Sequence, residues 1–392
     1  MKEVVIIGAA RTPIGRFGGS LKTLSAVDLA TIAIQSAVAR AGIEKEMVDM
    51  VIMGNCFDPL NQNVARIASV KCGIPVETPA FTVSATCVSA MQAIISGLHA
   101  ICVGDADIVV SGGAESMSNA PYVVTNARWG QRIRHGELID LLWRGMHEYP
   151  IPGAGMGMTA ENIAAKYDIS REEQDQYALL SHQRACRAIR EGKFKEEIVP
   201  VEVSSQKGEV KVVDVDEHPR PDTSLEKLSK LQPAFKRDGT VTAGNSSGIN
   251  DAAAAVVLAS YAKARELGLV PLGKIKGYAL VGVDPAYMGI GPVPATRRLL
   301  DKLSISLSQI DLIELNEAFA AQYLACEREL ALDRDIVNVN GSGIALGHPV
   351  GATGCRLVVT LLYEMRRRGS SLGLATLCAG GGHGYAMLIE RI

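Results

Sequence analysis

Apolar positions divide this chain into two kinds of segment. Short runs of Val, Ile, Leu and Ala that end in Gly or Asn predict buried strands, and they cover residues 3–12, 48–56, 106–116, 273–282, 310–318 and 373–383. Other segments have apolar residues three or four positions apart, which predicts a buried helix face. Residues 25–42 show this spacing at Leu29, Ile32, Ile34 and Val38. Strands that alternate with helices predict a parallel or mixed sheet with helices on both faces.

The strand pattern occurs twice along the chain. Asp49 in one predicted strand aligns with Asp311, and Gly112 in another aligns with Gly380. Because the two copies keep nearly the same spacing, we predict two similar α/β halves. The first half comprises residues 1–118 and 250–270, and the second comprises residues 271–392.

The intervening residues 119–249 differ in composition from both halves. They are richer in Arg, His, Glu and Pro, and residues 170–192 carry a helical pattern. We interpret this segment as a long inserted loop domain that covers one end of the first half.

Length and charge narrow the class of protein. A chain of 392 residues predicts two or three domains, and a net charge near −2 gives no reason to expect nucleic acid or an acidic membrane surface as partner. Apolar stretches such as residues 252–259 are well short of a membrane span. The N-terminus is typical of a first strand and not of a signal peptide. We therefore expect a soluble cytoplasmic protein.

The eight cysteines do not have the spacing of a zinc site. No C-x-x-C pair occurs, and we expect most of the thiols to be reduced core residues and no metal to be bound. They are Cys56, Cys72, Cys87, Cys102, Cys186, Cys326, Cys355 and Cys378.

Cys87 is the first candidate for chemistry. It follows a short strand, with Ser84 and Thr86 as possible caps, and the helical pattern starts near Cys87 itself. A helix N-terminus favours thiolate over thiol. The alternative is a small buried residue in a tight turn.

His348 and Asn316 lie at similar junctions. Gly347-His348-Pro349 precedes a strong apolar helix, and Asn316 ends a predicted strand. The glycines before His348 also fit an incidental turn or an anion-binding loop, although neither G-x-G-x-x-G nor G-K-[ST] is present. Asn316 suits either an oxyanion site or a helix cap.

Cys378 ends another predicted strand and is followed by Ala379 and then by three glycines. Backbone N–H groups freed by such glycines can form an oxyanion hole. In α/β sheets, strand ends are where ligands bind, and two halves that meet back to back would bring these residues into one pocket.

These motifs resemble those of the thiolases, acetyl-CoA C-acyltransferases, along the whole chain. The matching stretches include SATCVSAMQ, GGAESMSNAPY, MGMTAEN, DGTVTAGNSSGINDAAAA, GPVPATR, NEAFA, GHPVGATG and CAGGG. The resemblance implies the thiolase fold, in which duplicated α/β halves form a five-layered α-β-α-β-α core with an inserted loop domain. It also implies interconversion of two acetyl-CoA with acetoacetyl-CoA and CoA, in fatty acid metabolism, by a homotetramer that is a dimer of dimers.

The resemblance assigns roles to the candidates. Cys87 would be the acylated nucleophile, His348 its base, and Cys378 the thiol that moves a proton at the acetyl methyl. Asn316 would hold a water, and the N–H groups of Cys87 and Gly380 would form an oxyanion hole. CoA binding would fall to Arg220, Phe235, Ala243, Ser247, Met288, Met156 and Phe319, with CoA and acyl-CoA as substrates and no separate cofactor.

Some positions depart from the four-carbon members of the family. Ala90 stands where many have Gly, and Gly155 stands where short-chain biosynthetic members often have His. Residues 121–145 and Met288, however, resemble the biosynthetic members. A broader 3-ketoacyl-CoA thiolase is therefore the alternative, and a non-catalytic acyl-CoA-binding protein is the alternative from another class.

Overall fold

The computed structural model describes residues 2–133, 135–204 and 208–392. In these residues the main sheet has ten strands, in the order β12-β13-β14-β11-β1-β10-β5-β3-β4, with β2 beside β10. Its first-half strands are β1 (Val4–Arg11), β2 (Gly15–Arg16), β3 (Met50–Gly54), β4 (Ala80–Val83), β5 (Ile108–Ser116) and β10 (Asn250–Ser260). Its second-half strands are β11 (Gly273–Gly282), β12 (Leu312–Leu315), β13 (Leu372–Ala379) and β14 (His383–Glu390).

The two halves repeat one strand arrangement. In the first, β3 runs parallel to β5 and β10 lies antiparallel between β5 and β1; in the second, β12 runs parallel to β13 and β14 lies antiparallel between β13 and β11. Asp49 Oδ2 accepts N–H bonds from residues 107 and 108, and Asp311 Oδ2 accepts the same pair from residues 371 and 372. The predicted duplication is therefore confirmed down to a shared side-chain contact.

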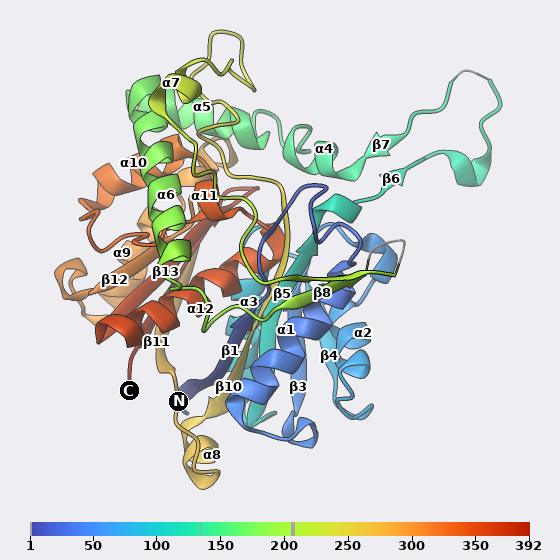
Figure 1. Ribbon diagram of the computed structural model, residues 1–392, viewed down its shortest axis with the longest axis vertical. Coiled ribbons are helices and arrows are strands. Elements are labelled where there is room, and N and C mark those ends of the chain that lie inside the picture. The colour runs from blue at the N-terminus through green and yellow to red at the C-terminus, as the bar shows by residue number, and fades with distance from the viewer. Residues whose placement is uncertain (1, 134, 205–207) are drawn as a thin grey trace.

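Helices complete the predicted layers (Figure 1). One outer layer contains α1 (Ala26–Ala41) and α2 (Val64–Lys71), the middle layer contains α3 (Ser89–Val103) and α12 (Val350–Arg368), and the other outer layer contains α9 (Pro292–Leu303) and α10 (Ala320–Leu330). The smaller helices are α8 (Tyr261–Glu266) and α11 (Gly343–Leu346). The order of helix and sheet is α-β-α-β-α, as predicted.

Strand periodicity explains how each half of the main sheet is covered on both faces. Along β10, Ala255 and Val257 pack with α1, while Val256 and Leu258 pack in the middle layer with α3 and α12. Successive side chains of a strand point to opposite faces, so a strand between two helix layers is apolar at every position. This is why β10 lacks the alternation of a half-exposed strand.

The middle helix α3 corrects the expectation that the apolar stretches are all well short of a membrane span. Residues Thr86–Val103 are long and apolar enough, with a mean hydropathy of 1.6, to meet the criteria for a membrane span by composition. In the structure 61% of that window is buried, because α3 lies between the two halves of the sheet. Its apolarity therefore follows from its place in the core.

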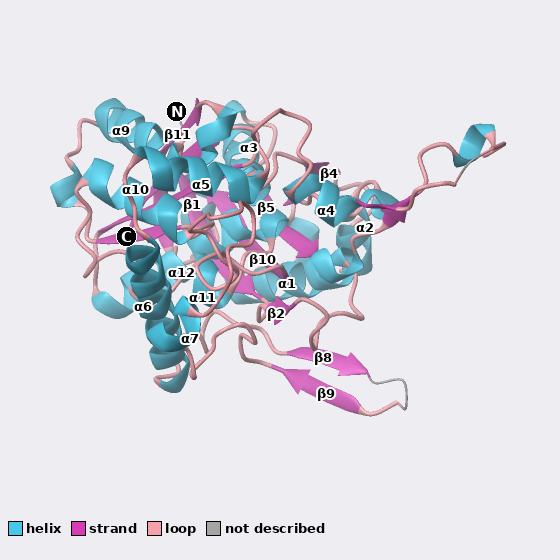
Figure 2. Cartoon of the chain, turned by 90° about the horizontal axis from the view of Figure 1, so that it is seen from above, coloured by secondary structure: helices cyan, strands magenta, loops and turns pink. Residues whose placement is uncertain are grey.

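The inserted segment forms a cap and two projections (Figure 2). Its helices are α4 (Leu141–Met146), α5 (Met156–Lys166), α6 (Arg171–Arg190) and α7 (Leu225–Ser229). One projection is the arm that carries β6 (Tyr122–Val123) and β7 (Ile139–Asp140), and the other is the hairpin of β8 (Val201–Ser204) and β9 (Val210–Val213). Residues 1, 134 and 205–207 of the predicted domain ranges lie outside the described residues. The domain boundaries stay a prediction.

A buried ion network joins the inserted segment to the core. Arg11 on β1 donates from Nε to Glu197 at 2.6 Å and from Nη1 to Asp216 at 2.7 Å, and all three side chains are buried. Buried charges persist only when they are paired and hydrogen-bonded. The network therefore fixes where the inserted chain returns to the sheet.

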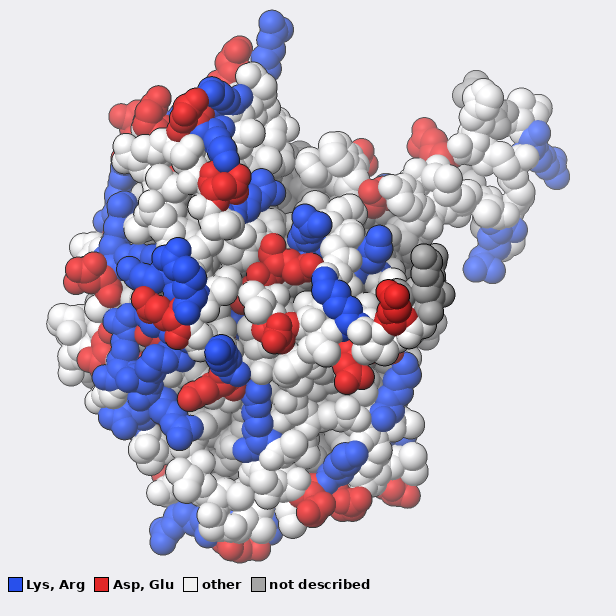
Figure 3. All heavy atoms as spheres, in the orientation of Figure 1, with Lys and Arg blue, Asp and Glu red and all other residues white. Residues whose placement is uncertain are grey.

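Basic side chains gather on one face over α6 and the end of α12 (Figure 3). Much of this charge has a partner inside the fold. Arg184 donates to the carbonyl of Val337 at 2.8 Å, and Arg367 donates to the carboxylate of Glu364. Arg184 thus joins α6 to residue 337, and Arg367 pairs within α12.

Candidate active site

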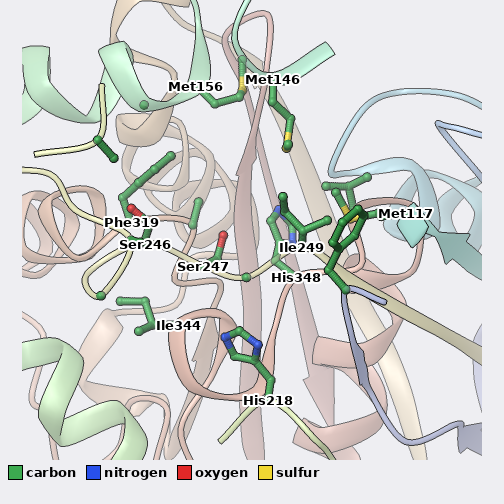
Figure 4. A pocket seen from close by; sticks show the side chains of 18 of the residues that line it. Met117, Met146, Met156, His218, Ser246, Ser247, Ile249, Phe319, Ile344 and His348 are labelled. Carbon is green, nitrogen blue, oxygen red and sulfur yellow. The ribbon is translucent and has the colours of Figure 1, made fainter. Parts of the chain in front are cut away.

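A cavity of about 730 Å³ lies where the two halves and the inserted segment meet. Cys87 from the first half, His348 and Gly380 from the second, and Phe235 from the inserted segment all line it. Figure 4 shows His348, Ser247, Phe319 and Met156 around this space. Cys87, His348 and Gly380, three of the residues expected in one pocket, therefore line the same cavity.

Cys87 sits in a strained turn and not at the first turn of a helix. Thr86 has φ 51°, a left-handed conformation that is costly for a β-branched residue. The helix α3 begins only at Ser89, whose hydroxyl donates to the carbonyl of Thr86 at 2.6 Å and accepts from the N–H of Ala85 at 2.8 Å. Neither Ser84 nor Thr86 caps the helix, because its N-cap is Val88 with no side-chain bond. The expected caps were wrong.

Two backbone N–H groups face the Cys87 sulfur. They belong to Gly380 and to Cys87 itself. Thr86 Oγ1 also donates to the carbonyl of Gly380 at 3.1 Å, which ties the Cys87 turn to the glycine run of the second half. That these two donors form an oxyanion hole stays a prediction.

Burial nevertheless keeps the Cys87 thiol protonated. Loss of solvent raises its pKa to about 11, and the two N–H groups offset this only in part. The expectation that the helix terminus favours thiolate is wrong for the ligand-free protein, because desolvation outweighs the backbone dipoles.

His348 is held so that one ring nitrogen remains available. The backbone N–H of His348 donates to Asn250 Oδ1 at 3.0 Å, and its ring nitrogen Nδ1 lies 2.7 Å from Thr353 Oγ1. Because that hydroxyl donates to the carbonyl of Pro349 at 2.9 Å, both contacts are satisfied when Nδ1 carries the proton. Nε2 then has a free lone pair, and it has no partner among the described residues. This is the arrangement that a general base requires.

Burial also keeps the imidazole neutral. The pKa of His348 falls to about 3, first through desolvation and then through the charge of Arg356. Gly347 beside it has φ 107°, and a Cβ there would lie 2.5 Å from Asn250. Glycine is therefore required for the backbone to bring His348 against Asn250.

Cys378 and Asn316 lie behind the cavity wall and do not line it. Cys378 is 1% exposed and packs with Met288, Ala318 and Phe319. Its pKa is raised well above the usual value, first by burial and then by the neighbouring Cys87 and Cys326. Asn316 is fully buried, and neither amide atom has a partner in the part of the chain that the structure describes. An unpartnered buried amide is available to hold a water.

The residues predicted to bind CoA do converge. The whole set lines the cavity: Arg220, Phe235, Ala243, Ser247, Met288, Met156 and Phe319. Gly157 lies under Phe235, since a Cβ at that position would be 2.1 Å from the ring. His383, which follows the glycine run, is exposed and does not line this cavity.

Sequence reasoning missed several polar residues around the cavity. His182 and His218 also line it, and burial lowers the pKa of each to about 4. The buried Glu115 and Glu317 each accept four hydrogen bonds beside the catalytic candidates. Glu115 is the last residue but one of β5 and Glu317 follows β12, and that position near a strand end was the available signal.

Comparison with known families agrees with this geometry. The model of the thiolase N-terminal domain matches residues 4–262, and that of the thiolase C-terminal domain matches residues 269–391. The chain belongs to the thiolase family. This thiolase is 51% identical to an acetyl-CoA acetyltransferase of Pseudomonas aeruginosa, over 100% of both chains.

Solved structures give the same result for the fold. The acetyl-CoA acetyltransferase of Bacillus anthracis has a TM-score of 0.98 at 50% identity, over 100% of this thiolase and 99% of that chain. Human mitochondrial 3-ketoacyl-CoA thiolase in complex with CoA has a TM-score of 0.95 at 46% identity, over 100% and 98%. The predicted fold is thereby confirmed.

We predict the pH dependence of Cys87 alkylation in the ligand-free thiolase. With a thiol pKa of about 11 and a His348 pKa of about 3, both groups are neutral at pH 7, so thiolate increases only as the pH rises toward the thiol pKa. Iodoacetamide labelling of Cys87, followed by peptide mass spectrometry, will rise steadily through the alkaline range. The urea-unfolded chain is the control, since its thiols titrate near about 8.5. Labelling that is already at its plateau at about pH 6 would contradict this prediction, because it would reveal a thiolate–imidazolium pair formed in the acid range.

Proposed function

We propose that this thiolase is an acetyl-CoA C-acetyltransferase, which interconverts two acetyl-CoA with acetoacetyl-CoA and CoA. The observation that carries the proposal is the Cys87 sulfur, which faces the N–H groups of Cys87 and Gly380 in the cavity that His348 also lines. A thiol nucleophile, a free imidazole nitrogen and two N–H donors are the parts that acyl transfer needs. The names of full-length relatives at about half identity support the same reaction.

In the first step Cys87 takes the acetyl group. His348 Nε2 accepts the thiol proton while Sγ attacks the thioester carbon of acetyl-CoA. The N–H groups of Cys87 and Gly380 stabilise the oxygen that becomes negative. The bond to the CoA sulfur breaks, and Cys378 gives that sulfur its proton. The step leaves acetyl-Cys87, protonated His348, the Cys378 thiolate and free CoA.

In the second step a carbon–carbon bond forms. The Cys378 thiolate removes a proton from the methyl of a second acetyl-CoA, and protonated His348 and a water on Asn316 stabilise the enolate oxygen. The enolate carbon attacks the acetyl-Cys87 carbonyl, and the bond to Cys87 breaks. Cys87 recovers its proton from His348, so both groups return to their neutral forms.

A broader 3-ketoacyl-CoA thiolase is the second candidate, and the cavity wall gives it support. Apolar side chains pack together beside Cys87: Cys56, Phe57, Met117, Met146, Ile249 and Val350. Methionines repack readily around ligands of different shape. Such a wall suits an alkyl chain longer than acetyl.

The tetramer is also part of the proposal. The arm that carries β6 and β7 projects from the body (Figures 1 and 2) and exposes Trp129 by 85% and Ile133 by 86%. Strand β4 lies at one end of the main sheet, with Phe81 42% exposed. Exposed apolar groups and a free sheet edge favour association. We assign β4 to a dimer contact and the arm to the contact between dimers.

The cellular setting is proposed on chemistry alone. All eight cysteines, each within the described residues, are free thiols, which suits the reducing cytoplasm. We place the reaction in fatty acid metabolism, with CoA and its thioesters as substrates and no separate cofactor.

The roles of Cys87 and Cys378 predict that replacing each thiol by Ser will block a different step of the reaction. Cys87→Ser will give no acetyl adduct with acetyl-CoA, while Cys378→Ser will still be acetylated, because its nucleophile, base and N–H donors are intact and solvent can protonate the departing CoA. Condensation by Cys378→Ser will fall by at least about 10²-fold, the lower range for losing an acid–base group. Peptide mass spectrometry and a condensation assay measure both effects. Cys102→Ser, a thiol outside the cavity lining, is the matched control. An acetyl adduct on Cys87→Ser would refute the nucleophile assignment.

Chain-length preference separates the two candidate functions. We expect kcat/KM for thiolysis to be higher with the four-carbon 3-ketoacyl-CoA than with six- or eight-carbon substrates, because a longer chain must first displace Met117 and Met146, which pack beside Cys87. Met117→Ala will raise the relative rate with the six-carbon substrate. Faster thiolysis of the longer substrates by the unaltered enzyme would favour the broader function.

The arm predicts the oligomeric state. Trp129→Ser combined with Ile133→Ser will convert a tetramer to a dimer in light scattering after gel filtration, because the arm loses its apolar contacts. Val270→Ser, at a residue 84% exposed elsewhere, is the matched control and will stay tetrameric. A tetramer that survives the double substitution would exclude the arm as the contact.

A further inference from the structure

The two halves come into close backbone contact where the first turn of α12 crosses the ends of β3 and β5. A Cβ on Gly54 would lie 2.8 Å from the carbonyl oxygen of Gly351, and a Cβ on Gly113 would lie 2.0 Å from it. A Cβ on Gly351 would in turn lie 2.6 Å from Glu115 Oε2. Three glycines are thus required for this backbone contact.

Glu115 lies at the centre of this crossing. It is on β5 and fully buried, and its carboxylate accepts four hydrogen bonds. Oε1 accepts from Asn55 Nδ2 at 2.9 Å and from the N–H of Phe57 at 3.0 Å. Oε2 accepts from the N–H of Cys56 at 3.1 Å and from the N–H of Gly351 at 2.9 Å. Burial raises the pKa of Glu115 to about 7, and the backbone donors oppose that rise.

The donors belong to two segments that lead to the reacting groups. Gly351 is in the first turn of α12, and His348 precedes Pro349, the N-cap of that helix. On the other side, Cys56 Sγ donates to the carbonyl of Thr86 at 3.2 Å, and Thr86 precedes Cys87. One carboxylate therefore connects the turn that carries the base with the loop that supports the nucleophile.

We propose that Glu115 is a positioning residue that sets the separation of Cys87 and His348 across the two halves. The proposal rests on the proposed function of those two groups. Glu115 itself is absent from the residues that line the described cavity, so it acts through Gly351 and Cys56 and not on the substrate. Its carboxylate offers acceptors on both oxygens, whereas an amide offers acceptors on one only.

Glu115→Gln tests the proposal. The amide nitrogen cannot accept the two N–H bonds on its side, so one of the two segments must shift. A displacement of about 1 Å between reacting groups can cost about 10²-fold in rate, and we expect a loss of that order in single-turnover acetylation of Cys87. Rapid quench and mass spectrometry measure the rate per folded enzyme, and calorimetry with CoA counts the folded sites. The Kd for CoA will be unchanged, because the predicted CoA contacts lie elsewhere.

A second variant and a control complete the experiment. In Gly351→Ala the new Cβ would meet Glu115 Oε2 at 2.6 Å and the Asn55 backbone at 2.9 Å, so this variant moves both sides of the same contact and will slow the same step even if Glu115→Gln does not fold. Glu197→Gln removes another buried carboxylate, bonded to Arg11 and Thr360 outside the cavity lining, and will lower stability with acetylation close to wild type.

Three outcomes are distinguishable. Slow acetylation with unchanged CoA affinity in Glu115→Gln or Gly351→Ala supports the proposal. Acetylation at the wild-type rate, or a loss confined to CoA affinity, overturns it. An unaltered enzyme that forms no acetyl-Cys87 refutes the proposed function itself.

Discussion

The active site depends on how closely the first turn of α12 lies against the ends of β3 and β5. Cys87 belongs to the first half of the chain and His348 to the second, so no local sequence fixes their relation. Gly54, Gly113 and Gly351 allow the two backbones to touch, and Glu115 binds across the contact. Any side chain at these glycines would separate the halves and, with them, the nucleophile and its base.

The duplicated fold explains why the contact is found there. Each half ends its parallel strands at the same edge of the sheet, where backbone N–H groups and polar side chains are free to face a ligand. The middle layer contains one helix from each half, α3 and α12, and it brings the two edges together. The cost of this placement is desolvation: the pKa of Cys87 rises to about 11 and that of His348 falls to about 3. The resting site is consequently neutral, and charge forms only as the reaction proceeds.

The hydrophobic pattern was sufficient to predict β1, β3, β5, β11, β12, β13 and the duplication, but β10 and β14 were not among the predicted strands. The five layers were expected from the family resemblance and not from the pattern. Period and polarity are local properties, and buried strands such as β5 display them along their whole length. The family motifs also placed Cys87, His348, Gly380 and the CoA residues, all of which line one cavity. The protonation state of Cys87 was not predictable, because helix position is local whereas desolvation depends on what two distant halves bury. The strained turn at Thr86 and the four donors on Glu115 likewise arise from tertiary contacts.

A crystal structure of the enzyme trapped with acetyl-CoA tests the central claim most directly. The account predicts an acetyl group on Cys87 Sγ, with its carbonyl oxygen in hydrogen-bond distance of the N–H groups of Cys87 and Gly380 and with His348 Nε2 facing the departing CoA sulfur. Acetylation of another cysteine, or an acetyl oxygen that points away from Gly380, would contradict it.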